Sequence, residues 1–491
     1  MTSYEPVIGL EVHAELLTRT KMFCDSPVVD TTSALPNTAV CPVCLGLPGT
    51  LPVINRRAVE LGLRVALALG CEVPSFSVFA RKNYFYPDLP KGYQISQFEL
   101  PLAIGGRLPL RTEGGTKSVR VQRVHLEEDT GKLFHVEAAR PYSLVDFNRA
   151  GVPLLEVVSE PDLHSVEEVK AYAIELRRLL CYLEVSSGDM DKGAIRLEAN
   201  VSLRPMGQQE LGTRVEIKNL NSFRALAHSV EYEIQRQQDV LEKGGVIRQE
   251  TLGWDESAGA TVIQRSKEEA HDYRYFPEPD LPPLEVDRAW LDRIAASVPE
   301  LPHARLERLA GQYGLSLSEA DRITAEKAIA DYFESAVAAA RVARPKMVAA
   351  WLVGDLFGLL NAKGKVLVRP EGQPEIAPDE LASLVDLVAS GTVSAPTAKS
   401  LLEAMLDTGK SARGLVEEGG LAQIDDAAAL EGLIARVLSD HAEQVELYRT
   451  GKRTVLEWLL GQVMKASQGR ANPSRVRSLL EEQLSSATPK G

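Results

Sequence analysis

Apolar and polar residues alternate without exception along residues 195–204 of the chain. Its odd positions are Ile, Leu, Ala, Val and Leu, and its even positions are Arg, Glu, Asn, Ser and Arg. Successive side chains of a strand point to opposite faces, so this alternation predicts a half-buried strand. The same pattern returns in residues 214–218, after a loop rich in turn residues, and predicts an antiparallel partner. The polar face carries cations, carboxylates and an amide, which suits either a site for a charged nucleotide or a solvated sheet face.

Further alternating segments in the first 290 residues predict more strands of the same kind. They cover residues 7–17, 119–127 and 154–158. Two helices interrupt them: one opens with the capping-box pattern Ser165-Val-Glu-Glu168, and the other runs from Ser222 to a Gly-Gly pair at 244–245. Strands and helices mix without regular βαβ alternation, which predicts an α+β domain built on antiparallel sheet.

The pattern changes after a proline-rich stretch at residues 276–283. Beyond it Ala, Leu, Glu and Arg dominate, and strand patterns almost vanish. We therefore expect an α+β domain over residues 1–290, a helical domain over 291–400 and a helical tail domain over 401–491, the last opening near Pro396. A length of 491 residues agrees with about three domains.

Composition narrows the class of protein. No apolar run approaches the length of a membrane span, and the N-terminus lacks the pattern of a signal peptide. Five cysteines in so long a chain are not a disulfide framework, so we expect a cytoplasmic protein without membrane contact. A net charge of −13 argues against a general nucleic-acid coat but leaves room for a local basic patch.

The chain also lacks several common catalytic motifs. It has no P-loop, no Gly-x-Gly-x-x-Gly fingerprint and no His-Glu-x-x-His. A Gly-Gly-Ser nucleophile loop of the amidase type is missing too, because the Gly-Gly pairs precede Arg107, Thr116, Val246 and Leu421. Nucleotide chemistry, if it occurs in this chain, would need a fold other than the standard nucleotide-binding folds that carry these motifs.

Acidic and imidazole side chains recur on the predicted strands. The segment 8–13 places Glu11 and His13 on one face, residues 125–129 add another His and three carboxylates, and Glu156 lies in an apolar run where it needs a partner. Oxygen ligands suit Mg²⁺, whereas His is an unusual ligand that could instead orient a water or shuttle a proton. The predicted Mg²⁺ set is Glu11, His13, Glu127, Glu128 and Glu156. The alternative for each residue is a surface carboxylate or an ion pair.

Two other segments carry candidate chemistry. Residues 81–97, which include Lys82, pack four aromatic residues among three cations, and a similar stretch covers 271–277. Aromatic rings can stack on a base while cations bind phosphate, or the segment is a packed loop. Cys24, Cys41 and Cys44 resemble most of a zinc site, but Ser26 stands where a fourth cysteine is expected, so zinc and buried free thiols both stay open.

The tail is basic in an acidic chain. Between residues 449 and 477 it has seven Lys or Arg residues against one Glu, a net charge of +6, beside an apolar helical stripe. Such a module suits contact with an RNA backbone, although a solvated helix face explains it equally well.

Several long motifs together resemble the B subunit of the aspartyl/glutamyl-tRNA amidotransferase. They lie, in the same order as in that family, at residues 8–13, 41–49, 81–97, 125–129, 148–156, 216–222, 266–277, 461–465 and 471–473. The resemblance implies a cradle-shaped N-terminal domain, a helical domain and a helical tail that contacts tRNA. It also implies that ATP and Mg²⁺ serve to phosphorylate the side chain of Glu on tRNA(Gln) or Asp on tRNA(Asn).

The resemblance further implies partners and site residues. A glutaminase A subunit supplies ammonia through a channel, and a small C subunit completes a heterotrimer. The cognate synthetase could join this assembly. The implied catalytic residues are Glu11, His13, Lys82, Glu127 and Glu156. The implied surroundings of the nucleotide and the acyl phosphate are Arg196, Glu198, Asn200 and Lys218. A competing hypothesis is a tRNA-binding scaffold without chemistry of its own, which fits the basic tail but not the clustered acidic motifs.

Overall fold

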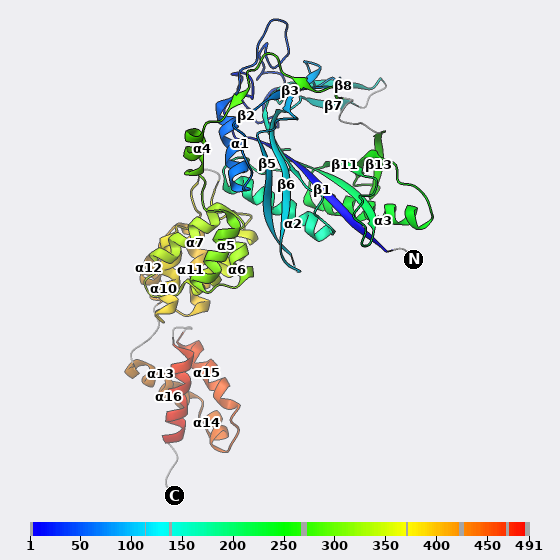
Figure 1. Ribbon diagram of the computed structural model, residues 1–491. Coiled ribbons are helices and arrows are strands. Elements are labelled where there is room, and N and C mark those ends of the chain that lie inside the picture. The colour runs from blue at the N-terminus through cyan, green and yellow to red at the C-terminus, as the bar shows by residue number, and fades with distance from the viewer. Residues whose placement is uncertain are drawn as a thin grey trace. The chain divides into compact units, whose positions relative to one another are not determined.

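The computed structural model divides the chain into two compact units, Met1–His303 and Ala304–Gly491 (Figure 1). It describes residues 3–112, 114–136, 140–266, 273–369, 372–421, 427–467 and 471–486. Residues 267–272 of the family motif at 266–277, which include the first two residues of the aromatic stretch 271–277, and Arg470 of the basic tail lie outside these ranges. Within the described ranges, no helix is both long and apolar enough to cross a membrane.

An eight-stranded sheet forms the frame of the first unit, in the order β13-β12-β11-β10-β1-β9-β6-β5. Its strands are β1 (Tyr4–Glu15), β5 (Ala103–Thr112), β6 (Gly115–Glu128), β9 (Pro153–Ser159), β10 (Ile195–Pro205), β11 (Val215–Leu220), β12 (Glu250–Asp255) and β13 (Ala260–Ser266). Neighbours are antiparallel except for the β11–β12 pair. The predicted antiparallel pairing of β10 with β11 is confirmed, as is the α+β class.

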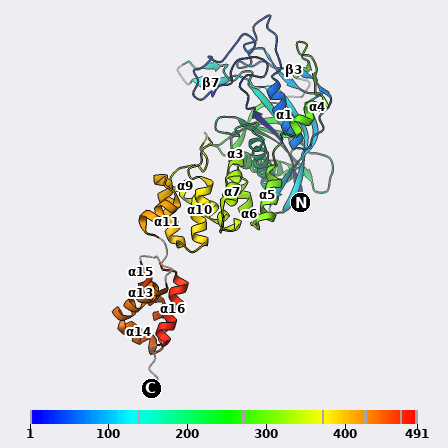
Figure 2. The same ribbon diagram turned by 90° about the vertical axis from the view of Figure 1, so that its left-hand side faces the viewer.

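Three helices cover one face of this sheet: α1 (Arg56–Ala68), α2 (Val166–Tyr182) and α3 (Phe223–Glu242). The apolar residues of the alternating strands, such as Leu10, Leu155 and Leu197, pack with them into the main core. Helix α4 (Arg288–Ala295) lies beside α1 in both ribbon views (Figures 1 and 2). Because the helices occupy a single face, the polar residues of β1, β9, β6, β10 and β11 are left to line a cavity on the other.

The two predicted helix starts are confirmed, but one cap differs in detail. Ser165 Oγ accepts a hydrogen bond from the Glu168 backbone N–H at 3.1 Å, and Ser222 caps α3 in the same way. The Glu168 carboxylate, however, accepts from the His164 backbone N–H at 2.7 Å and from Lys117 Nζ. Only half of the predicted capping box therefore forms, because the sheet offers Glu168 a cation.

Three small sheets bring distant segments to one end of the main sheet. They are β14-β3-β4 (Phe276–Pro277, Phe79–Asn83, Tyr93–Gln97), β15-β2 (Leu284–Glu285, Phe76–Ser77) and β7-β8 (Lys132–Val136, Tyr142–Asp146). The antiparallel pairing of β14 with β3 is reinforced where Arg81 donates two 2.7 Å hydrogen bonds to the Glu278 carboxylate. The two predicted aromatic segments are therefore neighbours in space, which the sequence did not reveal.

The second unit is helical and has two hydrophobic cores. The first core comprises residues 306–416 on α5 (Pro302–Tyr313), α6 (Leu317–Ile323), α7 (Lys327–Ala339), α8 (Pro345–Ala350), η2 (Trp351–Leu356), α9 (Phe357–Ala362), α10 (Pro378–Ala389), α11 (Ala395–Thr408) and α12 (Ala412–Gly419). The other comprises residues 430–484 on α13 (Ala427–Asp440), α14 (Ala442–Arg449), α15 (Val455–Ala466) and α16 (Pro473–Ser486). Helix α11 starts where a third domain was expected, yet its apolar residues belong to the first of these cores. The three-domain division stays a prediction.

Candidate active site

A polar cavity of about 730 Å³ lies on the face of the sheet that the helices leave free. Strand alternation supplies its walls: Glu11 and His13 from β1, Glu156 from β9, and Glu198 and Asn200 from β10. Of the predicted catalytic and nucleotide-binding residues, all nine line it: Glu11, His13, Lys82, Glu127, Glu156, Arg196, Glu198, Asn200 and Lys218. The half-buried strand face is therefore a cavity wall and not a solvated surface.

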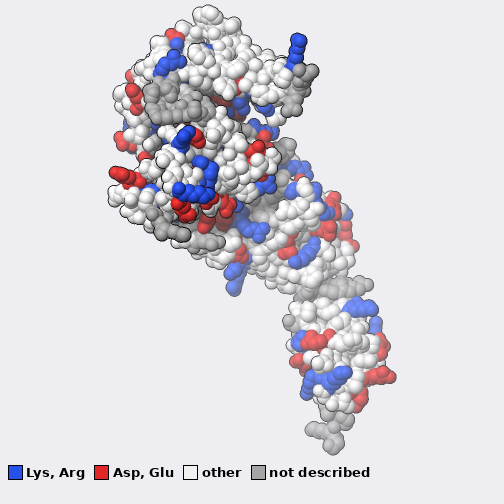
Figure 3. All heavy atoms as spheres, turned by 90° about the vertical axis from the view of Figure 1, so that its right-hand side faces the viewer, with Lys and Arg blue, Asp and Glu red and all other residues white. Residues whose placement is uncertain are grey.

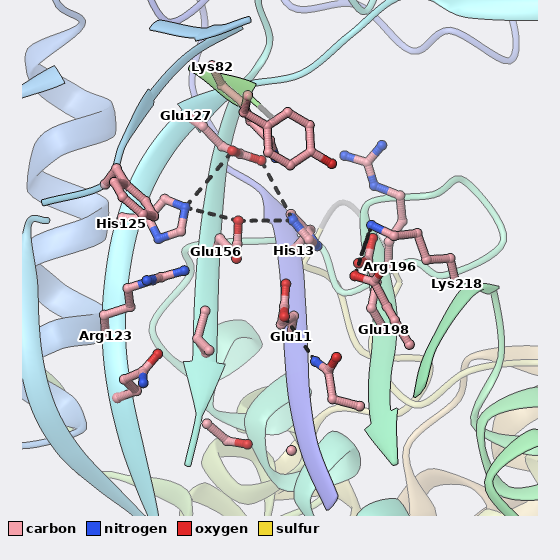
Figure 4. Close-up of a pocket in the computed structure, with 18 of the residues that line it drawn as sticks. Glu11, His13, Lys82, Arg123, His125, Glu127, Glu156, Arg196, Glu198 and Lys218 are labelled. Carbon is pink, nitrogen blue, oxygen red and sulfur yellow. Dashed lines mark hydrogen bonds and ion pairs between the residues drawn. The ribbon is translucent and has the colours of Figure 1, made fainter. Parts of the chain in front are cut away.

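Two imidazoles and two carboxylates form the centre of the cavity (Figure 4). Glu156 Oε2 lies 3.2 Å from His13 Nε2 and 2.9 Å from His125 Nε2, and Glu127 Oε1 lies 3.7 Å from His13 Nε2. Burial would lower the pKa of His13, but Glu156, Glu198 and Glu127 outweigh it and raise the pKa to about 9. Burial would likewise raise the pKa of Glu156, yet His125 and His13 hold it well below its usual range. Glu156 thus has the partners that its apolar run requires.

A second acidic group lies beside the first. One carboxylate oxygen each of Glu11, Glu198 and Glu216 falls within 4.8 Å of the others. Burial, with the charges of Glu156 and Glu198, raises the pKa of Glu11, which also accepts a 3.0 Å hydrogen bond from Asn200 Nδ2. Lys218 Nζ lies 2.8 Å from Glu198 and 3.3 Å from Glu216. Excess negative charge in one place favours a bound cation.

The two groups divide the predicted Mg²⁺ ligands between them. His13, Glu127 and Glu156 also place one ligand atom each within 4.8 Å of one another. Carboxylate oxygens dominate both groups, and such hard ligands fit Mg²⁺. A cation bound to the first group would replace the proton on His13, because a ligating imidazole must be neutral.

Glu128 does not join these groups, which corrects its place in the predicted ligand set. Its carboxylate pairs with Lys91 Nζ and accepts a 2.9 Å hydrogen bond from the Ile95 backbone N–H. It lines a smaller cavity of about 100 Å³ together with Cys44. Glu127 and Glu128 are consecutive on β6, so their side chains point to opposite faces of the strand.

Arg196 is held by a buried carboxylate. Its two terminal nitrogens lie 3.1 and 2.6 Å from the oxygens of Asp129, which is 3% exposed. Burial would raise the pKa of Asp129, but Arg149 and Arg196 lower it. This two-point contact fixes the guanidinium group at the cavity wall. Asp129 was not among the residues chosen from the sequence.

Lys82 lies above the imidazole–carboxylate centre in Figure 4, against a wall of aromatic rings. Its Nζ is 5.0 Å from the Tyr273 ring centroid. The Tyr84 ring meets Tyr273 edge-on at 6.0 Å, and Tyr275 stacks on Phe98 at 4.3 Å. Burial would lower the pKa of Lys82, but the nearby acidic groups raise it well above its usual value, so Lys82 is a cation. Residues of both predicted aromatic segments thus line one cavity, although Tyr84 is the only one of the four rings in 81–97 that does so.

Two β-bulges add wall residues that simple alternation misses. On β6, Val121 and Arg123 pair with adjacent residues of β9, and on β11 the pairing with β10 shifts between Ile217 and Leu220. Each bulge turns two consecutive polar residues to the cavity, namely Gln122 with Arg123 and Lys218 with Asn219. The sequence signal was a break of phase, since Val121 and Val124 are both core residues although their positions differ in parity.

The three cysteines meet, but they fit zinc poorly. Their sulfurs lie within 4.8 Å of one another, and the described residues offer no fourth Cys, His or carboxylate to this group. Instead the fully buried Lys21 brings its Nζ to 3.6 Å from Cys44 Sγ, and Ser26 Oγ lies at 3.8 Å. The thiol of Cys24, hydrogen-bonded to Cys44, lowers the pKa of the Cys44 thiol. The side chains of Lys21 and Ser26 therefore lie beside Cys44 Sγ where a further metal ligand would be needed.

The fold and the cavity define a class of protein, namely an enzyme whose half-buried sheet presents acidic groups suited to divalent cations beside cations suited to phosphate. The comparisons agree. Residues 6–292 match the family described as GatB/GatE catalytic domain, and residues 331–484 match the GatB domain. Full-length relatives are described as the B subunit of an aspartyl/glutamyl-tRNA(Asn/Gln) amidotransferase.

Three of these relatives show how close the match is. The protein of Moorella thermoacetica is 54% identical over 98% of this chain and 100% of its own length. The protein of Thermomicrobium roseum is 52% identical over 98% of this chain and 99% of its own length. The protein of Carboxydothermus hydrogenoformans is 49% identical over 99% of each chain. The chain belongs to the B-subunit family of the tRNA-dependent amidotransferases, a ligase family, and the resemblance seen in its motifs is confirmed.

Proposed function

We propose that this chain uses ATP to phosphorylate the side-chain carboxylate of an aspartyl or glutamyl group esterified to tRNA(Asn) or tRNA(Gln). Ammonia then attacks the acyl phosphate, forms the amide and releases phosphate. The relatives' names supply the two aminoacyl-tRNA substrates. The single observation that carries the proposal is the cavity in which nine residues chosen for this chemistry lie together.

The chemistry requires such activation. A carboxylate is a poor acyl donor because its leaving group would be oxide, whereas an acyl phosphate expels phosphate readily. Phosphoryl transfer depends mainly on positioning and on neutralising negative charge in flight. Lys82, Lys218 and Arg196 are suited to that task, because all three line the cavity as cations and Arg196 is fixed by Asp129.

We propose that the two acidic groups hold Mg²⁺, one through His13, Glu127 and Glu156 and the other through Glu11, Glu198 and Glu216. When bound, Mg²⁺ supplies a positive charge that screens the phosphates from these carboxylates. Asn200 holds Glu11 in place through its side-chain amide, and His125 does the same for Glu156. Both contacts orient oxygens toward the cavity before substrate arrives.

The proposal extends to partners. The sequence has no amidase nucleophile loop, so we propose that a glutaminase A subunit delivers the ammonia and that a small C subunit completes a heterotrimer. Ammonia would have to travel by an enclosed route, since it is protonated in water. Misacylated tRNA is the proposed nucleic-acid partner, and the cytoplasm is the proposed compartment. Exposed cations of the α14–α16 region, including Lys452 between α14 and α15 and Lys465 on α15, suit contact with tRNA.

The mixed charge of the tail limits that contact. Figure 3 shows Lys and Arg atoms interspersed with Asp and Glu atoms on the visible face of the C-terminal helices. Arg477 Nη2 lies 2.6 Å from Glu457, and Arg449 lies 3.8 Å from Glu446. We therefore propose a modest contribution to tRNA affinity from this region and not a dominant one.

Glu11→Ala in the assembled heterotrimer tests the proposed chemistry. Hydroxylamine traps an acyl phosphate as a hydroxamate, which can be quantified on the tRNA. We expect the variant to lose hydroxamate and amide formation by about a hundredfold or more, because a cation site loses a ligand. Glutaminase activity should remain, and it serves as the control for assembly. Chelation of Mg²⁺ should have the same effect on the unmodified protein; hydroxamate that persists after chelation would favour the scaffold hypothesis.

A further inference from the structure

Arg123 lies at the bulge on β6 and faces the cavity. Val119 and Val121 face the core on one side of the bulge, and Val124 and Leu126 face it on the other. Arg123 pairs with Val158 of β9 and lines the cavity two residues before His125. Figure 4 shows its guanidinium group pointing into the cavity below the His125–Glu156 pair. Bulges commonly re-aim a side chain beside an active site.

This guanidinium group has no carboxylate partner among the residues that the structure describes. Its Nε is buried and makes no hydrogen bond. Two other cations of the sheet wall differ, since Arg196 is bound by Asp129 and Lys218 by Glu198. Arg123 is half-buried, and an enclosed guanidinium nitrogen without a partner is costly, so its presence in a cavity wall points to an anionic ligand.

The surroundings favour a planar anion. The Arg123 Cζ lies 6.0 Å from the Phe98 ring, which is itself stacked on Tyr275, so the guanidinium group has an apolar platform on one side. Glu156 and Glu127 lie nearby and would repel a substrate carboxylate that arrived without compensation. A guanidinium group compensates best because its fork matches both oxygens of a carboxylate, whereas Lys82 offers a single point charge.

We propose that Arg123 binds the side-chain carboxylate of the aminoacyl group before phosphorylation and thereby distinguishes the acidic substrate from its amide product. The inference rests on the proposed function for the identity of that group. A carboxylate accepts two hydrogen bonds from the guanidinium group, while the neutral amide offers one acceptor oxygen and an NH₂ donor facing other donors. Conversion to the amide breaks this contact and favours release of the product.

The test compares binding of two stable tRNA analogues to the heterotrimer in the absence of ATP. The analogues carry glutamate or glutamine through an amide bond at the tRNA 3′ end. We expect the unmodified protein to prefer the glutamate form by about tenfold to a hundredfold. Arg123→Gln should abolish that preference, and Arg123→Lys should retain part of it. Arg120→Gln is the matched control, since Arg120 lies on the same strand but pairs with Asp162 outside the cavity.

The outcomes separate the alternatives. Equal preference in Arg123→Gln and the unmodified protein would overturn the assignment, as would no preference in the unmodified protein. If a separate steady-state assay of Arg123→Gln showed a raised KM for ATP while the preference stayed intact, Arg123 would bind a nucleotide phosphate instead, which also overturns the assignment. If Arg123 had a merely structural role, its substitution would weaken the binding of both analogues by the same factor, which would overturn the assignment. Thermal unfolding of both variants checks that the fold is intact. Because no ATP is present, the result is independent of whether phosphorylation occurs, which hydroxamate trapping tests separately.

Discussion

At the scale of single residues, the cavity depends on charges that partly neutralise one another. Glu156 is held between two imidazoles, and Asp129 holds Arg196. Among the described residues, Glu11 has only the Asn200 amide as a direct partner, and burial raises its pKa. A carboxylate kept near other carboxylates without a matching cation is an arrangement that a protein maintains at a site of function, because it costs stability.

Glu216→Gln tests the second acidic group at this scale. A carboxylate oxygen of Glu216 lies within 4.8 Å of one each of Glu11 and Glu198, so removing the charge of Glu216 should weaken binding of the divalent cation. We expect the Mg²⁺ concentration that half-saturates hydroxamate formation to rise about tenfold or more, as loss of a coordinating or supporting group typically does. Glu210→Gln is the control, since this exposed residue lies in the loop before β11. Identical Mg²⁺ dependence in the two variants would remove Glu216 from the site.

At the scale of elements, local signals decide where helices and strands begin, but neighbours decide their details. Ser165 and Ser222 cap their helices as the sequence indicates. The reciprocal half of the Ser165 capping box is lost because Glu168 finds Lys117 on β6. Similarly, the β6 bulge is visible in the sequence as two adjacent polar residues, yet only its partner strand β9 shows that Arg123 faces a cavity.

A buried carboxylate joins helices in the second unit and gives a pH-dependent prediction. Asp386 on α10 accepts hydrogen bonds from the backbone N–H groups of Arg341, Val342 and Ala343 at 2.8, 2.9 and 2.7 Å. Burial would raise the pKa of Asp386, but these donors hold it below its usual value of 3.8. The stabilisation is therefore present above that value and is lost as the pH falls through the lower pKa of the folded state.

We expect Asp386→Ala to destabilise the second unit by about 2 to 4 kcal/mol at pH 7, because three backbone donors lose their acceptor. The difference from the unmodified chain should shrink as the pH falls below 4. Urea unfolding of the full chain and amide hydrogen exchange at residues 341–343 measure both effects. Asp379→Ala, an exposed position on the same helix, should cost much less. Unchanged exchange at residues 341–343 would contradict the prediction.

At the scale of the whole molecule, the polar cavity and the basic tail belong to separate parts of the chain. Every residue of the cavity belongs to the first unit, and the basic helices have a hydrophobic core of their own. Helices α11 and α12 pack into the other core of the second unit, which comprises residues 306–416, so a cut near residue 400 would expose apolar surface. A chain that ends at Leu421 removes the basic helices while keeping that core whole.

We expect this shortened chain to keep its KM for ATP while its KM for tRNA rises about tenfold, since several phosphate contacts are lost. The salt dependence of tRNA binding should also become shallower. Full-length Lys452→Gln/Lys465→Gln should shift tRNA binding in the same direction by a smaller factor, without disturbing the fold, because both side chains are exposed. Equal tRNA dependence in all three proteins would refute a role for the tail.

The sequence alone determined the features that depend on near neighbours. Alternation at residues 195–204 identified β10, and the phase of this strand correctly separated core residues such as Leu197 from cavity residues such as Glu198. Periodicity and caps located α2 and α3. Long motifs were sufficient to recognise the family. These signals succeed because period-two and helical patterns are set by local geometry, which every strand and helix must obey.

Only the tertiary structure decided which distant residues meet. It placed β9 between β1 and β6, which brings Glu156 between two imidazoles. It turned Glu128 to Lys91 and away from Glu127, and it brought Lys21 to the cysteines. Sheet order depends on pairings such as β1 with β9 and with β10, whose segments lie more than a hundred residues apart, and no periodicity within one segment encodes its partner.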